Sequence, residues 1–147
     1  MSKAKEAIAE AIIIHIREED LEEILNVLSS AADEDVSIWR EVLRYELNSS
    51  KLLDEIVQFD IVVPKLIMYE VKTMSAFHFA ALRGAELILE SFLNLSIPVD
   101  MCLENGSTAL HLACFADKQE TVALLLNNFH ADINRHDRQV KSTYVCF

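Results

Sequence analysis

The hydrophobic residues near the start of the chain recur every three or four positions, which is the spacing of one helix face. In residues 3–16 they are Ile8, Ile12, Ile13 and Ile16. In residues 21–28 they are Leu21, Ile24, Leu25 and Leu28. An acidic run at residues 18–20 separates the two segments, so the pattern predicts a helical hairpin.

The next hydrophobic positions predict two more helices, over residues 38–47 and 52–59. Residues 48–50 (Asn-Ser-Ser) interrupt them, and an apolar segment follows at 61–71, in which Pro64 breaks any continuous helix. The segment either packs inside the N-terminal half or forms an exposed partner surface. We favour burial, because exposed apolar runs of this length are uncommon in monomers.

Two stretches in the second half of the chain repeat each other at a distance of 33 residues. The matched pairs are Ser75 with Thr108, Ala76 with Ala109, His78 with His111, Ala80 with Ala113, Leu93 with Leu126 and Asn94 with Asn127. Gly84 falls opposite Asp117, where a turn between two helices needs a left-handed residue. Such a period predicts a helical repeat, with one helix pair at 74–95 and another at 107–128.

The second copy resembles the ankyrin repeat. It contains Thr-Ala-Leu-His-Leu-Ala at 108–113, Leu-Leu-Leu at 124–126 and Ala-Asp-Ile-Asn at 131–134. The first copy keeps Ala-Ala at 80–81 and Val-Asp at 99–100. The resemblance implies an all-α, ankyrin-type solenoid that binds other proteins and is not an enzyme. It also implies that His78 and His111 bond to neighbouring turn backbone and tie adjacent repeats together.

The expected organisation has three parts. Residues 1–71 form degenerate N-terminal helical hairpins, as repeats or a cap, residues 72–138 form two ankyrin-like repeats, and residues 139–147 form an incomplete tail. The distance of 16 residues from Phe59 to Ser75 equals that from Phe92 to Thr108, which favours a second degenerate repeat in register. Solenoids normally end in a repeat with a polar outer face. Its absence at the tail indicates a fragment, a truncated product or a face that a partner covers.

Composition and charge narrow the classes of partner. The formal net charge is −11 and no stripe of Lys and Arg is present, which argues against binding nucleic acid. The apolar run Ala11–Ile16 is too short to span a membrane. Three cysteines without disulfide-type spacing indicate a reducing compartment, the cytoplasm or also the nucleus.

The acidic clusters at 18–23 and 33–35 could steer a basic partner, but both flank predicted helix starts. We therefore interpret them as helix caps with a solvated face. His111 and Cys114 lie one helical turn apart, yet they lack the further ligands that a zinc site needs. The period places Cys114 in the interior, where a thiol is a poor nucleophile. We expect no metal, no cofactor and no catalytic residue.

The resemblance implies that the variable positions of each first helix face a concave groove. They are Phe79, Leu82, Arg83, Leu112 and Phe115, and the finger residues Glu104, Asn105, Arg135 and His136 would form its rim. The apolar members could instead pack one repeat against the next, and the sequence leaves both readings open. We predict an adaptor or inhibitor-like regulator that binds another protein. The alternative is an oligomerisation module completed by self-association through its C-terminal face.

Overall fold

The computed structural model describes residues 2–32, 36–48, 73–104 and 106–132. Its helices are α1 (Ser2–Arg17), α2 (Leu21–Ala32), α3 (Val36–Arg44), α6 (Ala76–Arg83), α7 (Glu86–Leu93), α8 (Ala109–Phe115) and α9 (Gln119–Asn127). In these ranges the only strands are β1 (Leu47–Asn48) and β2 (Thr73–Met74), which pair antiparallel. The all-α repeat fold predicted from the sequence is confirmed. The predicted helix at 52–59 and the apolar segment at 61–71 lie outside the described residues.

Three helical hairpins form the described part of the stack, and each turns through a left-handed residue. The turns contain Glu19 (φ 56°), Gly84 (φ 75°) and Asp117 (φ 58°). This conformation suits glycine and is tolerated by aspartate better than by most residues. The sequence-based prediction for Gly84 and Asp117 is therefore confirmed.

The first helices of the second and third hairpins begin at side-chain caps. Ser75 Oγ accepts a hydrogen bond from the backbone nitrogen of His78, and Thr108 Oγ1 accepts one from that of His111. Such a cap satisfies one of the backbone N–H groups left over at a helix start. The 33-residue period in the sequence is thus also a period in local structure.

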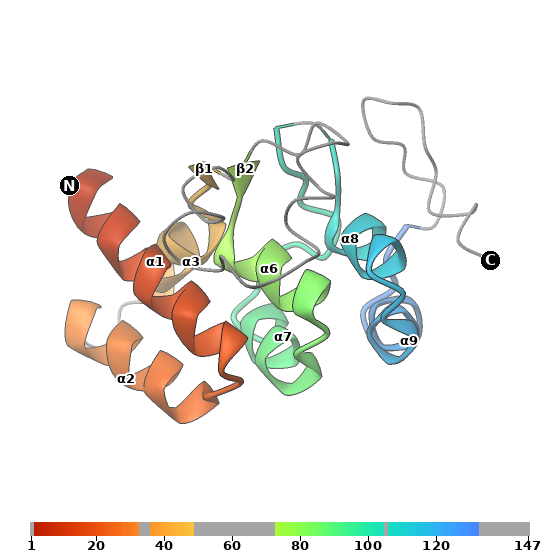
Figure 1. Cartoon of the computed structure of the whole chain (residues 1–147), viewed down its shortest axis with the longest axis horizontal. Helices are drawn as coiled ribbons and strands as arrows, with labels where there is room; N and C mark the ends of the chain where they lie inside the picture. The colour runs from red at the N-terminus through yellow and green to blue at the C-terminus, as the bar shows by residue number, and fades with distance from the viewer. Residues whose placement is uncertain (1, 33–35, 49–72, 105, 133–147) are drawn as a thin grey trace.

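The helices lie in two rows (Figure 1). The first-helix row is α1, α6 and α8, and the second-helix row is α2, α7 and α9. In the first-helix row, α6 packs against α1 on one side and α8 on the other. Helix α3 contacts both α1 and α6.

This arrangement differs from a strictly consecutive stack. Each repeat of a solenoid contacts only its neighbours, so a full repeat at residues 36–59 would separate α1 from α6. Instead α1 packs directly on α6, and α3 adds Val42 and Leu43 to the core that they share. Among the described residues, the α1–α2 hairpin is therefore a direct neighbour of α6. The predicted second degenerate repeat extends into residues outside the described ranges and stays a prediction.

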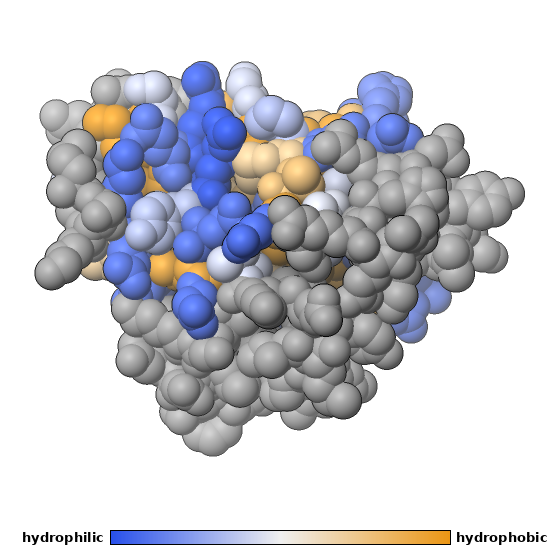
Figure 2. All heavy atoms as spheres, turned by 90° about the horizontal axis from the view of Figure 1, so that it is seen from above, coloured by the Kyte–Doolittle hydropathy of each residue, from blue (hydrophilic) through white to orange (hydrophobic). Residues whose placement is uncertain are grey.

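One hydrophobic core joins all three hairpins. Its largest fully buried side chains include Phe77, Phe79, Phe92, Ile12, Ile13 and Ile16. Figure 2 shows the described surface from the side of the β1–β2 pair, where hydrophilic residues dominate and hydrophobic ones reach the surface in smaller areas.

The loops beside the β1–β2 pair are joined by long-range hydrogen bonds. Glu46 Oε1 accepts from the hydroxyl of Thr73 at 2.5 Å and from the backbone nitrogen of Glu104 at 3.0 Å. Arg40 Nε donates to the carbonyl oxygen of Leu95 at 2.7 Å. These bonds hold the α3–β1 segment against the loops of the following hairpins.

Candidate protein-binding surface

A buried histidine joins α6 to the next loop. His78 Nε2 lies 2.9 Å from the carbonyl oxygen of Met101, and Nδ1 lies 2.6 Å from Ser75 Oγ. Burial lowers the pKa of His78 to about 4, against a smaller raising effect of the Met101 bond. The imidazole is therefore neutral at pH 7, and the carbonyl requires the proton on Nε2. The tying role that the resemblance implied is confirmed for His78.

The equivalent His111 shares the capping arrangement. Its Nδ1 accepts from the backbone nitrogen of Thr108 at 3.0 Å, while Thr108 Oγ1 accepts from the backbone nitrogen of His111 at 3.3 Å. These reciprocal bonds form a capping box at the start of α8. Among the described residues, no group of three or more His, Cys, Asp or Glu is placed to hold a metal ion.

The sequence-predicted groove residues divide into a buried and an accessible set. Phe79, Leu82 and Leu112 are buried in the core. Helices α1, α3 and α8 all pack on α6, which leaves its apolar side chains no open face. The sequence left open whether these three residues face a groove or pack one repeat against the next, and in the structure they pack between repeats. They offer no surface to a partner.

The accessible set consists of Arg83, Phe115 and Glu104. Phe115, on the last turn of α8, is 37% exposed, whereas Leu82, its counterpart 33 residues earlier, is 2% exposed. Arg83 is exposed, and its Nη2 donates to the carbonyl oxygen of Arg17 at 3.2 Å. Glu104 is exposed on a finger loop.

The remaining rim residues, Asn105, Arg135 and His136, lie outside the described residues. Cys114 is half-buried and Cys102 is exposed, and both are thiols. The sequence had placed Cys114 in the interior, but the last turn of α8 is only partly covered.

Sequence reasoning missed two exposed leucines in the second-helix row. Leu87 on α7 is 74% exposed and Leu25 on α2 is 41% exposed. The sequence does contain a signal that Leu87 is exposed, because the equivalent residue 33 positions later is the charged Glu120. A position that is charged in one repeat is a surface position in the other.

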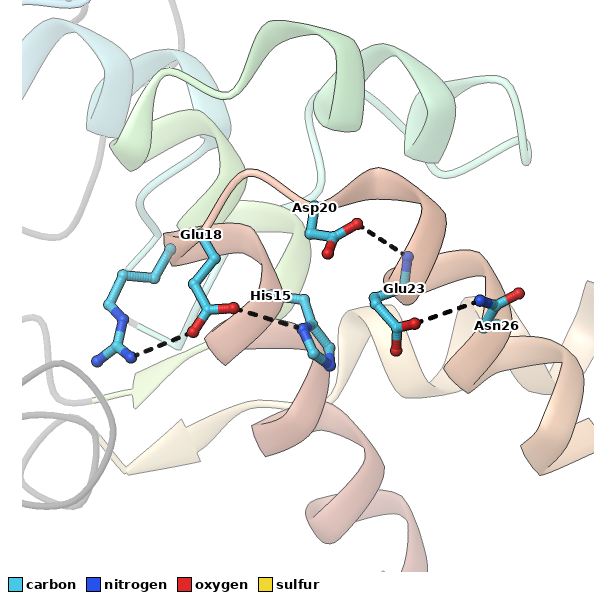
Figure 3. A network of polar contacts seen from close by, with 6 residues as sticks. His15, Glu18, Asp20, Glu23 and Asn26 are labelled. Carbon is cyan, nitrogen blue, oxygen red and sulfur yellow. Dashed lines mark hydrogen bonds and ion pairs between the residues drawn. The ribbon is translucent and has the colours of Figure 1, made fainter.

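The turn between α1 and α2 carries a polar network (Figure 3). Asp20 Oδ1 accepts from the backbone nitrogen of Glu23 at 3.2 Å, which confirms the capping interpretation at this residue. Glu18 lies 3.9 Å from His15 Nδ1 and 3.8 Å from an Arg17 nitrogen. Contacts this long between partly exposed groups contribute little stability.

The second-helix row and its turns also border two adjoining cavities. One, of about 450 Å³, lies at the turns that contain Gly84 and Asp117 and is lined mainly by charged residues. The other, of about 350 Å³, includes Leu21, Leu87 and Ile88 in its lining. Both volumes are modest, and both cavities lie open to solvent.

Comparison with protein families matches residues 45–137 to a model of ankyrin repeats in three copies. The match covers more than half of the chain and begins upstream of residue 74, where the sequence resemblance becomes specific. Comparison with curated proteins finds no match. None of the helices in the described ranges has the length and apolar character needed to cross a membrane.

Proposed function

The chain belongs to the ankyrin-repeat family, and from this premise we propose that it binds a partner protein through the exposed end of its first-helix row. Ankyrin repeats are generally protein–protein interaction modules and are typically not enzymes. Stacked repeats create extended surfaces of the kind that such binding uses.

The observation that carries the proposal is the exposure of Phe115. Aromatic side chains are enriched among the few residues that dominate binding energy at interfaces. The counterpart Leu82 is covered by neighbouring helices, so exposure at this position is not imposed by the repeat. We assign Phe115 the role of anchor, and we keep Arg83, Glu104, Asn105, Arg135 and His136 as the further partner-binding residues that the ankyrin pattern implies.

Within this function we favour an adaptor or inhibitor-like regulator without catalytic activity. A net charge of −11 favours a basic partner, because complementary charge speeds encounter and disfavours acidic competitors. The thiols of Cys102 and Cys114 suit the cytoplasm or nucleus, where thiols stay reduced.

Affinity capture from the native cell, followed by mass spectrometry, tests the proposal. The wild-type chain, Phe115→Glu and Leu25→Glu serve as baits, and Leu25 is the matched control because it is an exposed apolar residue of similar accessibility on α2. A partner retained by the wild type and the control but lost by Phe115→Glu supports the proposal. Light scattering tests the alternative, because self-association would double the mass with rising concentration.

A further inference from the structure

A second surface lies at the turns between the two helix rows. Its first part is the charged cavity of about 450 Å³, which we call the acidic cleft. Four carboxylates line it: Glu19, Glu86, Asp117 and Glu120. They outnumber its two cations, Arg83 and Lys118, so the cleft carries an excess of negative charge.

Of the two cations, one donates to a backbone carbonyl, and the other packs its aliphatic part against a turn. Arg83 donates to the carbonyl oxygen of Arg17, and the aliphatic part of Lys118 lies against Gly84, so closely that a Cβ there would come within 2.9 Å of Lys118 Cδ. In the described part of the chain, neither Glu86 nor Glu120 forms an ion pair. The two cations therefore offset only part of the acidic charge of the cleft.

Two further observations indicate a missing donor. Burial raises the pKa of Glu86. The hydrogen bond that its protonated carboxyl donates to Glu120, and the negative charge of Glu120, raise the pKa further, so the two carboxyl groups lie close together. Thr121, in the wall of the same cleft, is 1% exposed, and its Oγ1 has no hydrogen-bond partner. A buried hydroxyl without a partner is costly, and a bound donor would satisfy it.

The second part of the surface is the cavity of about 350 Å³ beside Leu21, Leu87 and Ile88, which we call the apolar groove. Glu19, Gly84 and Glu86 line both cavities, so the groove and the cleft adjoin. Leu87 is 74% exposed, and no other large hydrophobic side chain in the described ranges is as accessible. Isolated exposed leucines are ordinary, but this one stands in a groove with an acidic wall.

We propose that this surface docks a segment of a partner protein that places an arginine side chain in the acidic cleft and a neighbouring large apolar side chain in the apolar groove. A guanidinium presents five donors in a planar fork and can bond two carboxylates and a hydroxyl together. Consecutive Cα atoms lie about 3.8 Å apart, so residues of one short segment reach both cavities. Phe115 lines neither cavity, although Arg83 belongs to both surfaces, and the inference goes beyond the proposed function.

Selection of a random 12-residue peptide library on the immobilised full chain tests the inference without assuming the partner. The enriched peptides should carry arginine beside leucine, isoleucine, methionine or phenylalanine. Fluorescence polarisation then gives the affinity of one enriched peptide for the wild type and the variants. We expect losses of at least about tenfold, the scale of a single good contact, in Leu87→Ser and in the double variant Glu86→Gln/Glu120→Gln.

Two controls separate this surface from the others. Glu22→Gln removes an exposed carboxylate of α2 that lines neither cavity, and it should leave the affinity within about twofold, a change below 1 kcal/mol. Phe115→Glu, at a residue that lines neither cavity, should also leave the peptide affinity within about twofold. Thermal melts of all variants show whether each remains folded.

Several results would overturn the inference. They are the absence of enrichment, enriched peptides without a basic residue, and equal affinity in all variants. Binding that Phe115→Glu abolishes and Leu87→Ser leaves intact would also overturn it, while supporting the proposed function. A concentration-dependent doubling of mass that Leu87→Ser removes would identify a second copy of this chain as the occupant and reject a separate partner.

Discussion

The imidazole of His78 on α6 bonds to the carbonyl oxygen of Met101, 23 residues further along the chain, at 2.9 Å from Nε2. The bond needs no charge on the ring, and burial lowers the pKa of His78 to about 4. The hydrogen bond between α6 and the following loop is therefore made by a neutral histidine at pH 7.

This link makes folding stability depend on pH. The unfolded chain binds a proton at His78 below about pH 6.5, whereas the folded chain resists it until about pH 4. Stability from this group is complete above pH 6.5 and falls as the pH drops toward 4, by about 2 kcal/mol between pH 7 and 5. Urea denaturation at the two pH values measures it.

Carboxylates also titrate between pH 5 and 7, so the effect of His78 is isolated by comparing the pH dependence of stability between variants. His78→Gln should be less stable at pH 7 but should lose less stability on going to pH 5. His130→Asn removes an exposed histidine at a positive φ, which asparagine tolerates, and should keep the wild-type difference. Equal pH dependence in all three proteins would refute the assignment to His78.

The turns at Gly84 and Asp117 should respond in opposite directions to mutation. Gly84→Ala puts a side chain at φ 75° and should cost about 1–2 kcal/mol, whereas Asp117→Gly relieves φ 58° and should stabilise by a few tenths to about 1 kcal/mol. Adding Lys118→Ala to Gly84→Ala tells backbone strain from the close contact with Lys118. If the strain dominates, the double variant recovers little stability in a denaturant titration.

The face of α9 should show a graded response to alanine. Leu125 is fully buried, Leu126 is half-buried against the core, and Asn127 is exposed. Leu125→Ala should cost about 2–5 kcal/mol, Leu126→Ala clearly less and Asn127→Ala under about 0.5 kcal/mol. Chemical denaturation of the three variants gives the order, and equal losses would show that the helix face is misassigned.

Much of the repeat region could be predicted because its signals are local. The caps at Ser75 and Thr108 and the left-handed turns at Gly84 and Asp117 depend on residues a few positions apart. Helical spacing likewise predicted α1 and α2. These features are set by backbone chemistry that a single repeat contains.

The rest depends on contacts between distant segments, which periodicity does not report. Nothing in the 33-residue register shows that α1 packs on α6, or that Phe79 and Leu112 are buried while Phe115 is exposed. Leu87 was overlooked because it adjoins buried Ile88 in an apolar run. The equivalent residue in the next repeat, Glu120, marks the position of Leu87 as a surface position. That exposure can be predicted only by comparing the two repeats position by position.

The affinity of a captured partner for Phe115→Glu, measured beside a thermal melt of the same protein, tests the central claim most directly. Because Phe115 is 37% exposed, the melting temperature should stay within a few degrees of the wild type, and affinity should fall by at least about 2 kcal/mol, or roughly 30-fold. Leu112→Glu, which buries an unpaired carboxylate, should instead unfold the chain. A Phe115→Glu protein that melts normally and binds its partner as tightly as the wild type would contradict the account.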